Sequence, residues 1–188
     1  KYISGVGCNA TASNLALLPL VRAGLLDPET PIVVDLKVGS SEGGNKSNSA
    51  SHHPERSGVV RSFAPTGHRH TAEVEQELGL SGVNLSVTSI EMVRGAFATV
   101  HAWSKEPLQD KHLWKAYRSV YGDEPFVRIV KDRAGIHRFP EPKLLSGTNS
   151  ADVGFAIGED GKRVVSLCAI DNLMKGAAGS ALQSLNLA

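Results

Sequence analysis

Cys8 is the residue of this sequence whose surroundings best suit covalent chemistry. It follows the segment Gly5-Val-Gly7 and directly precedes an apolar periodicity that predicts a helix over residues 9–24. A helix N-terminus lowers the pKa of a thiol, and its free backbone N–H groups can stabilise an oxyanion. Cys8 is therefore a candidate nucleophile, although an unpaired cysteine is also a common small buried residue.

Two histidines, His68 and His70, directly precede a second predicted helix, which Thr71 can cap. A thiol nucleophile needs a base to accept its proton and an acid to protonate an oxyanion later, and histidine performs both tasks near neutral pH. The pair could instead bind a metal. None of the five other histidines completes a metal-ligand spacing, so we predict no metal site.

Two glycine-rich segments could bring a ligand close to the backbone. Gly39–Gly44 (GSSEGG) follows a predicted strand, and its backbone N–H groups could hold an anion, although flexible linkers share this composition. Lys175–Gly179 (KGAAG) places small residues on one face of the last predicted helix. This arrangement suits close packing against a neighbouring element, and it equally suits the close approach of a ligand or cofactor.

The elements that must position these residues follow from hydrophobic periodicity and turn signals. Helices are predicted over residues 9–24, 71–80, 107–121 and 171–185, and strands over 31–39, 83–91, 95–103, 126–131, 151–157 and 163–170. Gly158-Glu-Asp-Gly161 predicts a hairpin between the last two strands. Residues 40–67 are too polar for a core and predict a long functional or mobile loop. This order predicts an α+β fold, with helices covering a mixed, largely antiparallel sheet.

Composition sets limits on the class of protein. The chain has 188 residues, 41% of them hydrophobic, and a formal net charge of +1, which suits one domain with a sizeable core. The near-neutral charge disfavours nucleic acid as a main partner, and no apolar run is long enough to span a membrane. The two cysteines cannot form a disulfide framework, so we expect a cytoplasmic location.

We also expect this sequence to be a segment of a longer protein. It begins with Lys1-Tyr2-Ile3, without an initiator methionine, and reaches its first motif at residue 7. No G-x-G-x-x-G motif lies between a strand and a helix, so we expect a nucleotide-binding domain to be absent from this chain.

Five segments occur together in a characteristic order. They are Gly7-Cys-Asn-Ala-Thr-Ala12, the Gly39–Gly44 loop, His68-Arg-His-Thr-Ala-Glu73, Glu124-Pro-Phe-Val-Arg128 and Ile170-Asp-Asn-Leu-Met-Lys-Gly-Ala-Ala-Gly179. In this combination the chain resembles the C-terminal half of the N-acetyl-γ-glutamyl-phosphate reductases. It also resembles their lysine-pathway relatives, which act on 2-aminoadipate 6-phosphate held on an amino-group carrier protein. The resemblance covers nearly the whole chain.

Two departures from the family pattern refine the resemblance. The acetyl-glutamyl branch commonly has Tyr-Pro after the cysteine, whereas this chain has Asn9-Ala10, which favours the archaeal carrier-protein branch. The family's Gly/Ser loop tends to end in arginine, where this chain has Asn45 or Lys46.

The resemblance implies a chemistry and a set of site residues. Such enzymes use NADPH to reduce an acyl phosphate to a semialdehyde in lysine or arginine biosynthesis. Cys8 would displace inorganic phosphate to form a thioester, and hydride transfer would give a thiohemiacetal that collapses to the product. His68 would be the general acid/base. Asn172 would contact NADPH, and Gly176 would allow its close approach.

The resemblance also implies an architecture. Residues 1–188 would form a catalytic and dimerisation domain like the C-terminal domain of glyceraldehyde-3-phosphate dehydrogenase, in a homo-oligomer. NADPH would be bound mainly by an N-terminal Rossmann domain that this chain does not contain. Two alternatives stay open: an enzyme similar to aspartate-semialdehyde dehydrogenase, which also joins a cysteine to a later histidine, and a non-catalytic assembly or carrier-binding module.

Overall fold

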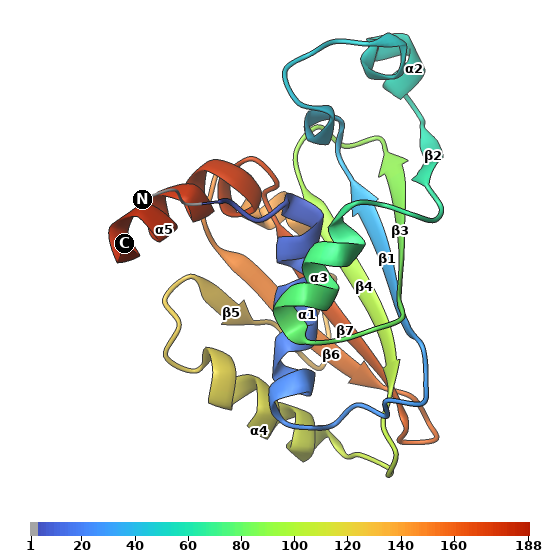
Figure 1. The fold of residues 1–188 in the computed structure, drawn as a ribbon, viewed down its shortest axis with the longest axis vertical. Coiled ribbons are helices and arrows are strands. Elements are labelled where there is room, and N and C mark those ends of the chain that lie inside the picture. The colour runs from blue at the N-terminus through green and yellow to red at the C-terminus, as the bar shows by residue number, and fades with distance from the viewer. Residues whose placement is uncertain (1–3) are drawn as a thin grey trace.

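Seven strands form one mixed sheet, in the order β2-β3-β1-β4-β7-β6-β5 (Figure 1). The computed structural model describes residues 4–188, so the Lys1–Ile3 start lies outside the described residues. The strands are β1 (Ile32–Val38), β2 (Val60–Ala64), β3 (Val83–Ile90), β4 (Ala96–Trp103), β5 (Val127–Ile129), β6 (Ala151–Ile157) and β7 (Arg163–Ile170). Only the β1–β3 and β5–β6 pairs are parallel among the described strands, so the predicted α+β fold with a largely antiparallel sheet is confirmed.

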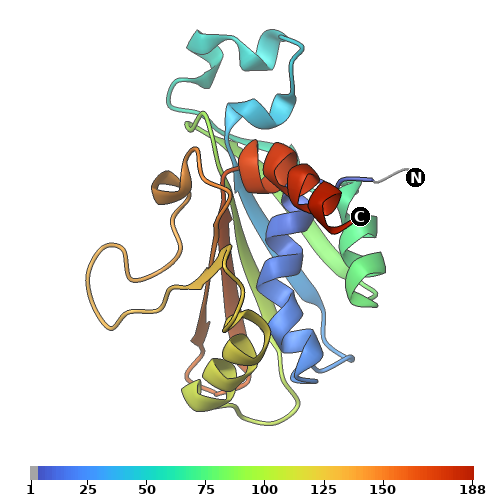
Figure 2. The same ribbon diagram turned by 90° about the vertical axis from the view of Figure 1, so that its left-hand side faces the viewer.

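The chain has five α-helices among its described residues. They are α1 (Cys8–Arg22), α2 (His53–Arg56), α3 (His70–Leu78), α4 (Asp110–Tyr121) and α5 (Gly179–Leu187), with a π-helix at Met174–Ala178. Of these, α1, α3 and α4 cover one face of the sheet, whereas α2 lies beyond its end (Figures 1 and 2). Helix α1 contacts α3, α4, β4 and β7, and therefore lies at the centre of the covered face. No helix within residues 4–188 is long and apolar enough to cross a membrane.

Strand β4 explains why helices cover one face and not the other. Its alternating pattern places Ala96, Ala98, Val100 and Ala102 on one face, and all four are completely buried. The opposite face, which includes Phe97 and Trp103, stays partly exposed. Because α1 also presents small buried residues such as Ala12 and Ala16, the helix can pack closely against the sheet.

Two backbone carbonyl groups in the middle of helix α1 accept hydrogen bonds from neighbouring elements, and a proline inside the helix leaves one of them available. Pro19 lies inside the helix and has no N–H, so it cannot donate to the carbonyl of Leu15. The Tyr121 hydroxyl of α4 donates to that carbonyl at 2.7 Å. The next carbonyl, that of Ala16, accepts from Ser166 Oγ of β7 at 2.6 Å. These bonds tie α1 to α4 and β7, and so fix the position of Cys8 at its first residue.

The long polar segment is more structured than its composition predicts. Within residues 40–67 lie the 3₁₀ turns Ser40–Gly43 and Ser49–Ser51, helix α2 and strand β2. Strand β2 pairs with β3 at the edge of the sheet. The sequence does not predict this strand, because its large apolar side chains, Val60 and Phe63, are mostly exposed, and an edge strand carries no buried alternation.

The last predicted helix begins later than expected. Asp171 caps the segment as predicted, since its carboxylate accepts from the backbone N–H groups of Leu173 at 2.8 Å and Met174 at 3.1 Å. The chain then forms the wide π-helix, in which the Gly176 N–H donates to the Asp171 carbonyl at 3.0 Å, five residues back. The other predicted elements are present, and the hairpin at Gly158–Gly161 joins β6 to β7.

Candidate active site

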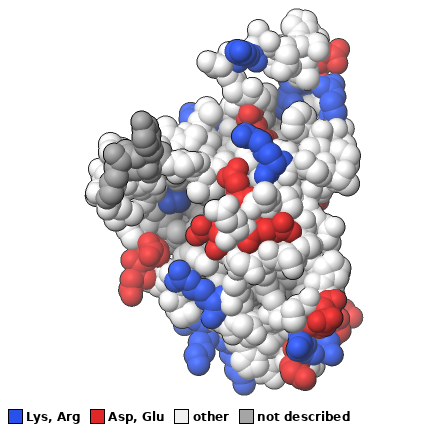
Figure 3. Space-filling view, viewed as in Figure 1, with Lys and Arg blue, Asp and Glu red and all other residues white. Residues whose placement is uncertain are grey.

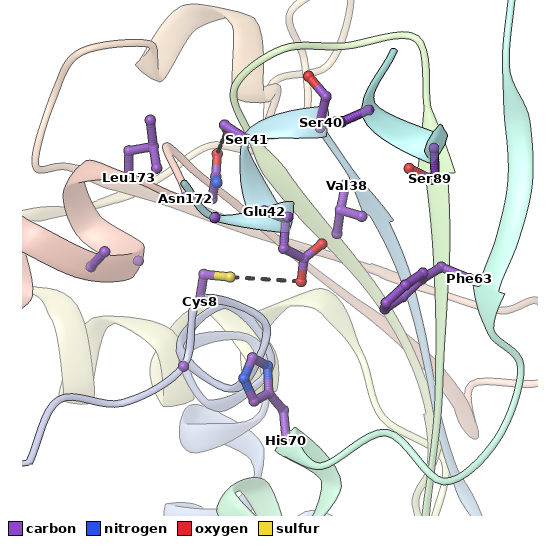
Figure 4. A pocket seen from close by; sticks show the side chains of 18 of the residues that line it. Cys8, Val38, Ser40, Ser41, Glu42, Phe63, His70, Ser89, Asn172 and Leu173 are labelled. Carbon is purple, nitrogen blue, oxygen red and sulfur yellow. Dashed lines mark hydrogen bonds between the residues drawn. The ribbon is translucent and has the colours of Figure 1, made fainter. Parts of the chain in front are cut away.

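A pocket of about 530 Å³ opens at the N-terminal end of α1 (Figure 4). Cys8, His68, Asn172 and Gly176, the four site residues predicted from the sequence, all line it. The Gly39–Gly44 loop forms another part of the wall. Segments that are far apart in the sequence therefore meet at one cavity.

Cys8 is the first residue of α1, and Gly7 precedes the helix in an extended conformation. The thiol donates to Glu42 Oε1 at 3.7 Å, and Figure 4 shows the two side chains facing each other. Burial and the Glu42 carboxylate raise the pKa of the Cys8 thiol to about 12, although a backbone N–H group at Asn9 acts in the opposite direction. Our expectation of a lowered thiol pKa is therefore wrong for this arrangement, because burial and a nearby carboxylate outweigh the helix terminus.

Glu42 is a site residue that sequence analysis missed. It lies in the 3₁₀ turn of the Gly/Ser loop, where its carboxylate also accepts a hydrogen bond from the Asn9 side-chain amide. Burial raises the pKa of the Glu42 carboxyl. The loop was interpreted through its backbone N–H groups alone. The one acidic residue among glycines and serines was the signal that could have revealed it.

The Gly/Ser loop is anchored to the turn between β3 and β4. The Ser40 N–H donates to the Met92 carbonyl at 2.8 Å, and the Ser41 N–H donates to the Val93 carbonyl at 3.0 Å. Gly39 lies so close to this turn that an added Cβ would be 2.6 Å from the Val93 oxygen. The loop, and Glu42 with it, is thus held at the mouth of the pocket.

Both histidines of the motif reach the pocket, in different settings. His68 is partly exposed, and its Nδ1 accepts from the His70 backbone N–H at 3.2 Å. His70 is only 2% exposed, and neither of its ring nitrogens has a hydrogen-bond partner. Burial lowers the pKa of both imidazoles. Both are therefore neutral near pH 7 and able to accept a proton.

Helix α3 is fitted closely to the residue before the cysteine. Glu73 of α3 accepts from the Gly7 backbone N–H at 2.8 Å. A Cβ added to Gly7 would lie 2.1 Å from His70 Nε2, so only glycine leaves room for the imidazole. The two contacts set the position of His70 relative to the start of α1. The acidic side chains of α3 are visible near the centre of the face in Figure 3.

Asn172 and Gly176 hold the other wall of the pocket. The Asn172 Oδ1 accepts from the Gly95 N–H at 2.8 Å and from Ser41 Oγ at 3.1 Å, which ties the Gly/Ser loop to the start of β4. A Cβ added to Gly176 would lie 2.6 Å from the Cβ of Cys8. Gly176 thus allows the π-helix to pack directly against the candidate nucleophile. The roles of both residues toward a cofactor stay predictions.

Comparison with known families and proteins gives three results. The family described as "semialdehyde dehydrogenase, dimerisation domain" matches residues 8–172. A protein of Deinococcus radiodurans named LysW-L-2-aminoadipate 6-phosphate reductase is 52% identical over 99% of this chain and 53% of its own length. A protein of Thermomicrobium roseum, which bears the same name provisionally, is 55% identical over 100% of this chain and 55% of its own length.

Solved structures agree on the fold. The aspartate semialdehyde dehydrogenase II of Vibrio cholerae superposes with a TM-score of 0.76 over 98% of this chain and 61% of its own, at 15% identity. At this identity the likeness concerns the fold alone. The chain spans about half the length of the curated relatives that it matches.

Proposed function

Because the chain belongs to the semialdehyde dehydrogenase family through its dimerisation domain, we propose that it is the catalytic part of an NADPH-dependent acyl-phosphate reductase. The resemblance to the carrier-protein reductases, which the motifs predicted, is confirmed by relatives that bear those names. The observation that carries the proposal is the meeting of Cys8, two neutral histidines and the Gly/Ser loop at one pocket.

The first chemical step follows from Cys8. Its Sγ attacks the acyl carbon, the S–C bond forms, the carbon–oxygen bond to phosphate breaks, and inorganic phosphate leaves. The thiol proton must be removed as the S–C bond forms, since the thiol is protonated at neutral pH in the arrangement described. We propose that a neutral imidazole accepts it. We propose that backbone N–H groups of the first turn of α1, which have no intrahelical acceptor, stabilise the oxyanion of the tetrahedral centre.

The resemblance assigns the acid/base role to His68, and the structure adds His70 as a second candidate. His68 is the more accessible of the two, and its Nδ1 accepts a backbone hydrogen bond. His70 is fixed beside the residue that precedes Cys8. Separate His68→Gln and His70→Gln variants assign the role, because the pH dependence of kcat/KM should lose its imidazole limb in only one of them.

We propose that the pocket wall formed by Leu173, Gly176 and Ala177 receives the ring of the cofactor. Gly176 and Ala177 lack large side chains, and Leu173 contributes partly exposed apolar surface at the same wall. NADPH, when bound, supplies the hydride that reduces the thioester. The chain's own part would then be to protonate the developing oxygen, giving a thiohemiacetal. A base would remove that proton again as the C=O bond forms and the Cys8 C–S bond breaks, which releases the aldehyde and the Cys8 thiolate. We propose that most contacts to NADPH are made by a domain that this chain does not contain.

We further propose that the substrate is carried on a protein. The Deinococcus radiodurans relative is named for LysW-linked aminoadipate 6-phosphate, and that of Haloarcula marismortui is provisionally named for both aminoadipate and glutamate. A pathway of lysine or arginine biosynthesis in the cytoplasm follows from this proposal. The partly exposed sheet face around Phe97 and Trp103 is our proposed contact in a homo-oligomer.

The test is steady-state kinetics of the whole protein in the oxidative direction, with phosphate and NADP. Carrier-linked aminoadipate semialdehyde, N-acetylglutamate semialdehyde and aspartate semialdehyde are compared as substrates. The proposal predicts turnover of the first with wild-type protein and none with Cys8→Ser. Preference for aspartate semialdehyde would favour the alternative enzyme, and absence of NADPH binding and turnover would favour a non-catalytic module.

A further inference from the structure

Three potential metal ligands from two separate segments meet in the pocket. One donor atom each of Glu42, His68 and His70 lies within 4.8 Å of the others. We call this group the Glu42–His68–His70 cluster. Sequence spacing could not reveal it, because Glu42 comes from the Gly/Ser loop, whereas both histidines come from the start of α3.

His70 gives the cluster its most informative feature. Its side chain is 3% exposed, and both ring nitrogens are buried without a hydrogen-bond partner. The nearest carboxylate oxygen given for it, Glu73 Oε1, is 3.8 Å from Nε2, which is too long for a hydrogen bond. Buried polar groups normally have a partner, and an unsatisfied one calls for an explanation such as a bound ion.

Glu42 supplies the charge that a cation requires. Its carboxylate is only partly exposed, and its hydrogen-bond donors, the Asn9 amide and the Cys8 thiol, are both neutral. The nearest cation that affects it, Arg69, is itself exposed to solvent. The negative charge therefore lacks a buried partner of opposite sign, which is a costly arrangement that a bound cation would relieve.

Cys8 lies beside the cluster but outside the group whose donor atoms are all within 4.8 Å of one another, so its side chain must turn toward the imidazoles to become a fourth ligand. Its Sγ is 3.7 Å from Glu42 Oε1, and ligands around a tetrahedral Zn²⁺ are separated by about 3.5 Å, given bond lengths of about 2.0–2.3 Å. Two imidazoles and one glutamate are a known zinc ligand set, and a thiolate adds preference for a soft metal over Mg²⁺ or Ca²⁺.

We propose that the Glu42–His68–His70 cluster binds a divalent transition metal, Zn²⁺ above all, with Cys8 Sγ as the fourth ligand. As the Zn–S bond forms, the S–H bond breaks and the proton passes to solvent. Metal binding then removes the thiol from reaction. The site is therefore inhibitory, and a chelator restores the free Cys8.

The two histidines are unequal ligands. His68 Nδ1 already accepts the His70 N–H, so coordination through Nε2 requires the other tautomer and the loss of that bond. His70 loses nothing of this kind, because its nitrogens have no partner. The affinity should therefore depend more on His70 than on His68.

The test is a Zn²⁺ titration of the chelator-treated whole protein against a chromophoric chelator. One Zn²⁺ per chain is expected. His70→Gln and Glu42→Gln should each weaken binding by at least about tenfold, and His68→Gln by less. His52→Gln and Glu159→Gln make the same chemical changes at exposed positions outside the cluster and should leave affinity unchanged. If His70→Gln fails to fold, Glu42→Gln and His68→Gln carry the test.

Co²⁺ then identifies the fourth ligand. A sulfur-to-cobalt charge-transfer band is expected in the wild-type protein and should vanish in Cys8→Ser, whereas Cys168→Ser should retain it. Zn²⁺ should also protect Cys8 from iodoacetamide. Failure to bind one Zn²⁺, or equal weakening by the exposed control variants, overturns the site, and binding without the charge-transfer band overturns the role of Cys8. None of these measurements uses enzyme turnover, so they succeed or fail independently of the proposed reductase activity.

Discussion

The thiols of Cys8 and Cys168 both have a raised pKa, but the two side chains lie in different surroundings. Cys168 lies in the middle of β7, is completely buried, and has its thiol pKa raised mainly by burial. Cys8 lies at a helix start on a pocket, and its thiol pKa of about 12 depends on burial together with Glu42. Ground-state pKa therefore does not separate the candidate nucleophile from the structural cysteine.

Cys8 and Cys168 differ in whether a ligand can reach the thiol and change its surroundings. A substrate or metal entering the pocket can replace the hydrogen bond between the Cys8 thiol and Glu42, because both side chains line the pocket. Nothing of the kind can reach Cys168 without opening the core, because its side chain is completely buried among apolar residues between the sheet and the helices. The comparison teaches that the candidate nucleophile differs from the core cysteine in having neighbours at a pocket that can donate or accept protons.

The largest expected effect on activity comes from replacing a cysteine by serine, which we compare at Cys8 and at Cys168. Cys8→Ser should reduce acyl-phosphate reduction by at least on the order of 10³-fold, because serine is a far weaker nucleophile without strong activation. Cys168→Ser should retain activity per folded molecule and lose about 1–3 kcal/mol of unfolding free energy, because it buries a hydroxyl. Kinetics and urea denaturation of both variants provide the measurement. Equal loss of activity in both would remove the distinction.

A smaller but still large effect is expected at the packing contact behind Cys8. Gly176→Ala places a Cβ 2.6 Å from the Cys8 Cβ, so the π-helix or Cys8 must shift, at a cost of about 1–3 kcal/mol. We expect a lower kcat and a lower unfolding midpoint. Gly5→Ala is the matched control, since an added Cβ there meets nothing within 4 Å. Unchanged kcat in Gly176→Ala would show that the contact does not position Cys8.

The charge of Glu42 should control the reactivity of Cys8 in metal-free protein. A nearby carboxylate disfavours the thiolate, so Glu42→Gln should lower the pKa of Cys8 from about 12. At a fixed pH below that pKa, alkylation by iodoacetamide should be faster by about tenfold for each unit of decrease. Mass spectrometry assigns the alkylated cysteine, and Cys168 should stay unmodified in the folded protein. A slower reaction of Cys8 in Glu42→Gln would contradict the electrostatic account.

The smallest effect concerns the helix that carries Cys8. Tyr121→Phe removes the hydroxyl that donates to the Leu15 carbonyl opposite Pro19, so it should cost about 1 kcal/mol of unfolding free energy. Cys168 should remain protected from alkylation, whereas Cys8 should react slightly faster as α1 loosens. Urea denaturation followed by alkylation kinetics checks both effects. An unchanged unfolding free energy would mean that the bond is not needed for α1 packing.

Local sequence patterns predict much of the fold, because most strands bury every second residue and most helices bury one face. The alternation in β4 predicted a strand with one buried face, and the glycines around residue 160 predicted the β6–β7 hairpin. Strand β2 could not be predicted, because an edge strand with exposed Val60 and Phe63 has no buried pattern. The π-helix could not be predicted either, since it depends on tertiary packing of Gly176 against Cys8.

The sequence predicted several residues that line the pocket, but neither Glu42 nor the electrostatics of the candidate site. The motifs pointed to Cys8 and His68, and the structure places both at one pocket. The thiol pKa was predicted in the wrong direction because its largest cause, burial, and its second, the carboxylate of Glu42 34 positions away in the sequence, both arise only on folding. Local sequence could show the helix terminus that lowers a thiol pKa, but not the burial and carboxylate that raise it.

The most direct test of the central claim is to trap the acyl group on Cys8. The whole protein is mixed with the carrier-linked acyl phosphate without NADPH, and its peptides are then analysed by mass spectrometry. The account predicts the acyl mass on the peptide that contains Cys8, release of one inorganic phosphate per active site, and neither in Cys8→Ser. Acyl-phosphate reduction by Cys8→Ser at a rate near that of the wild type would contradict it.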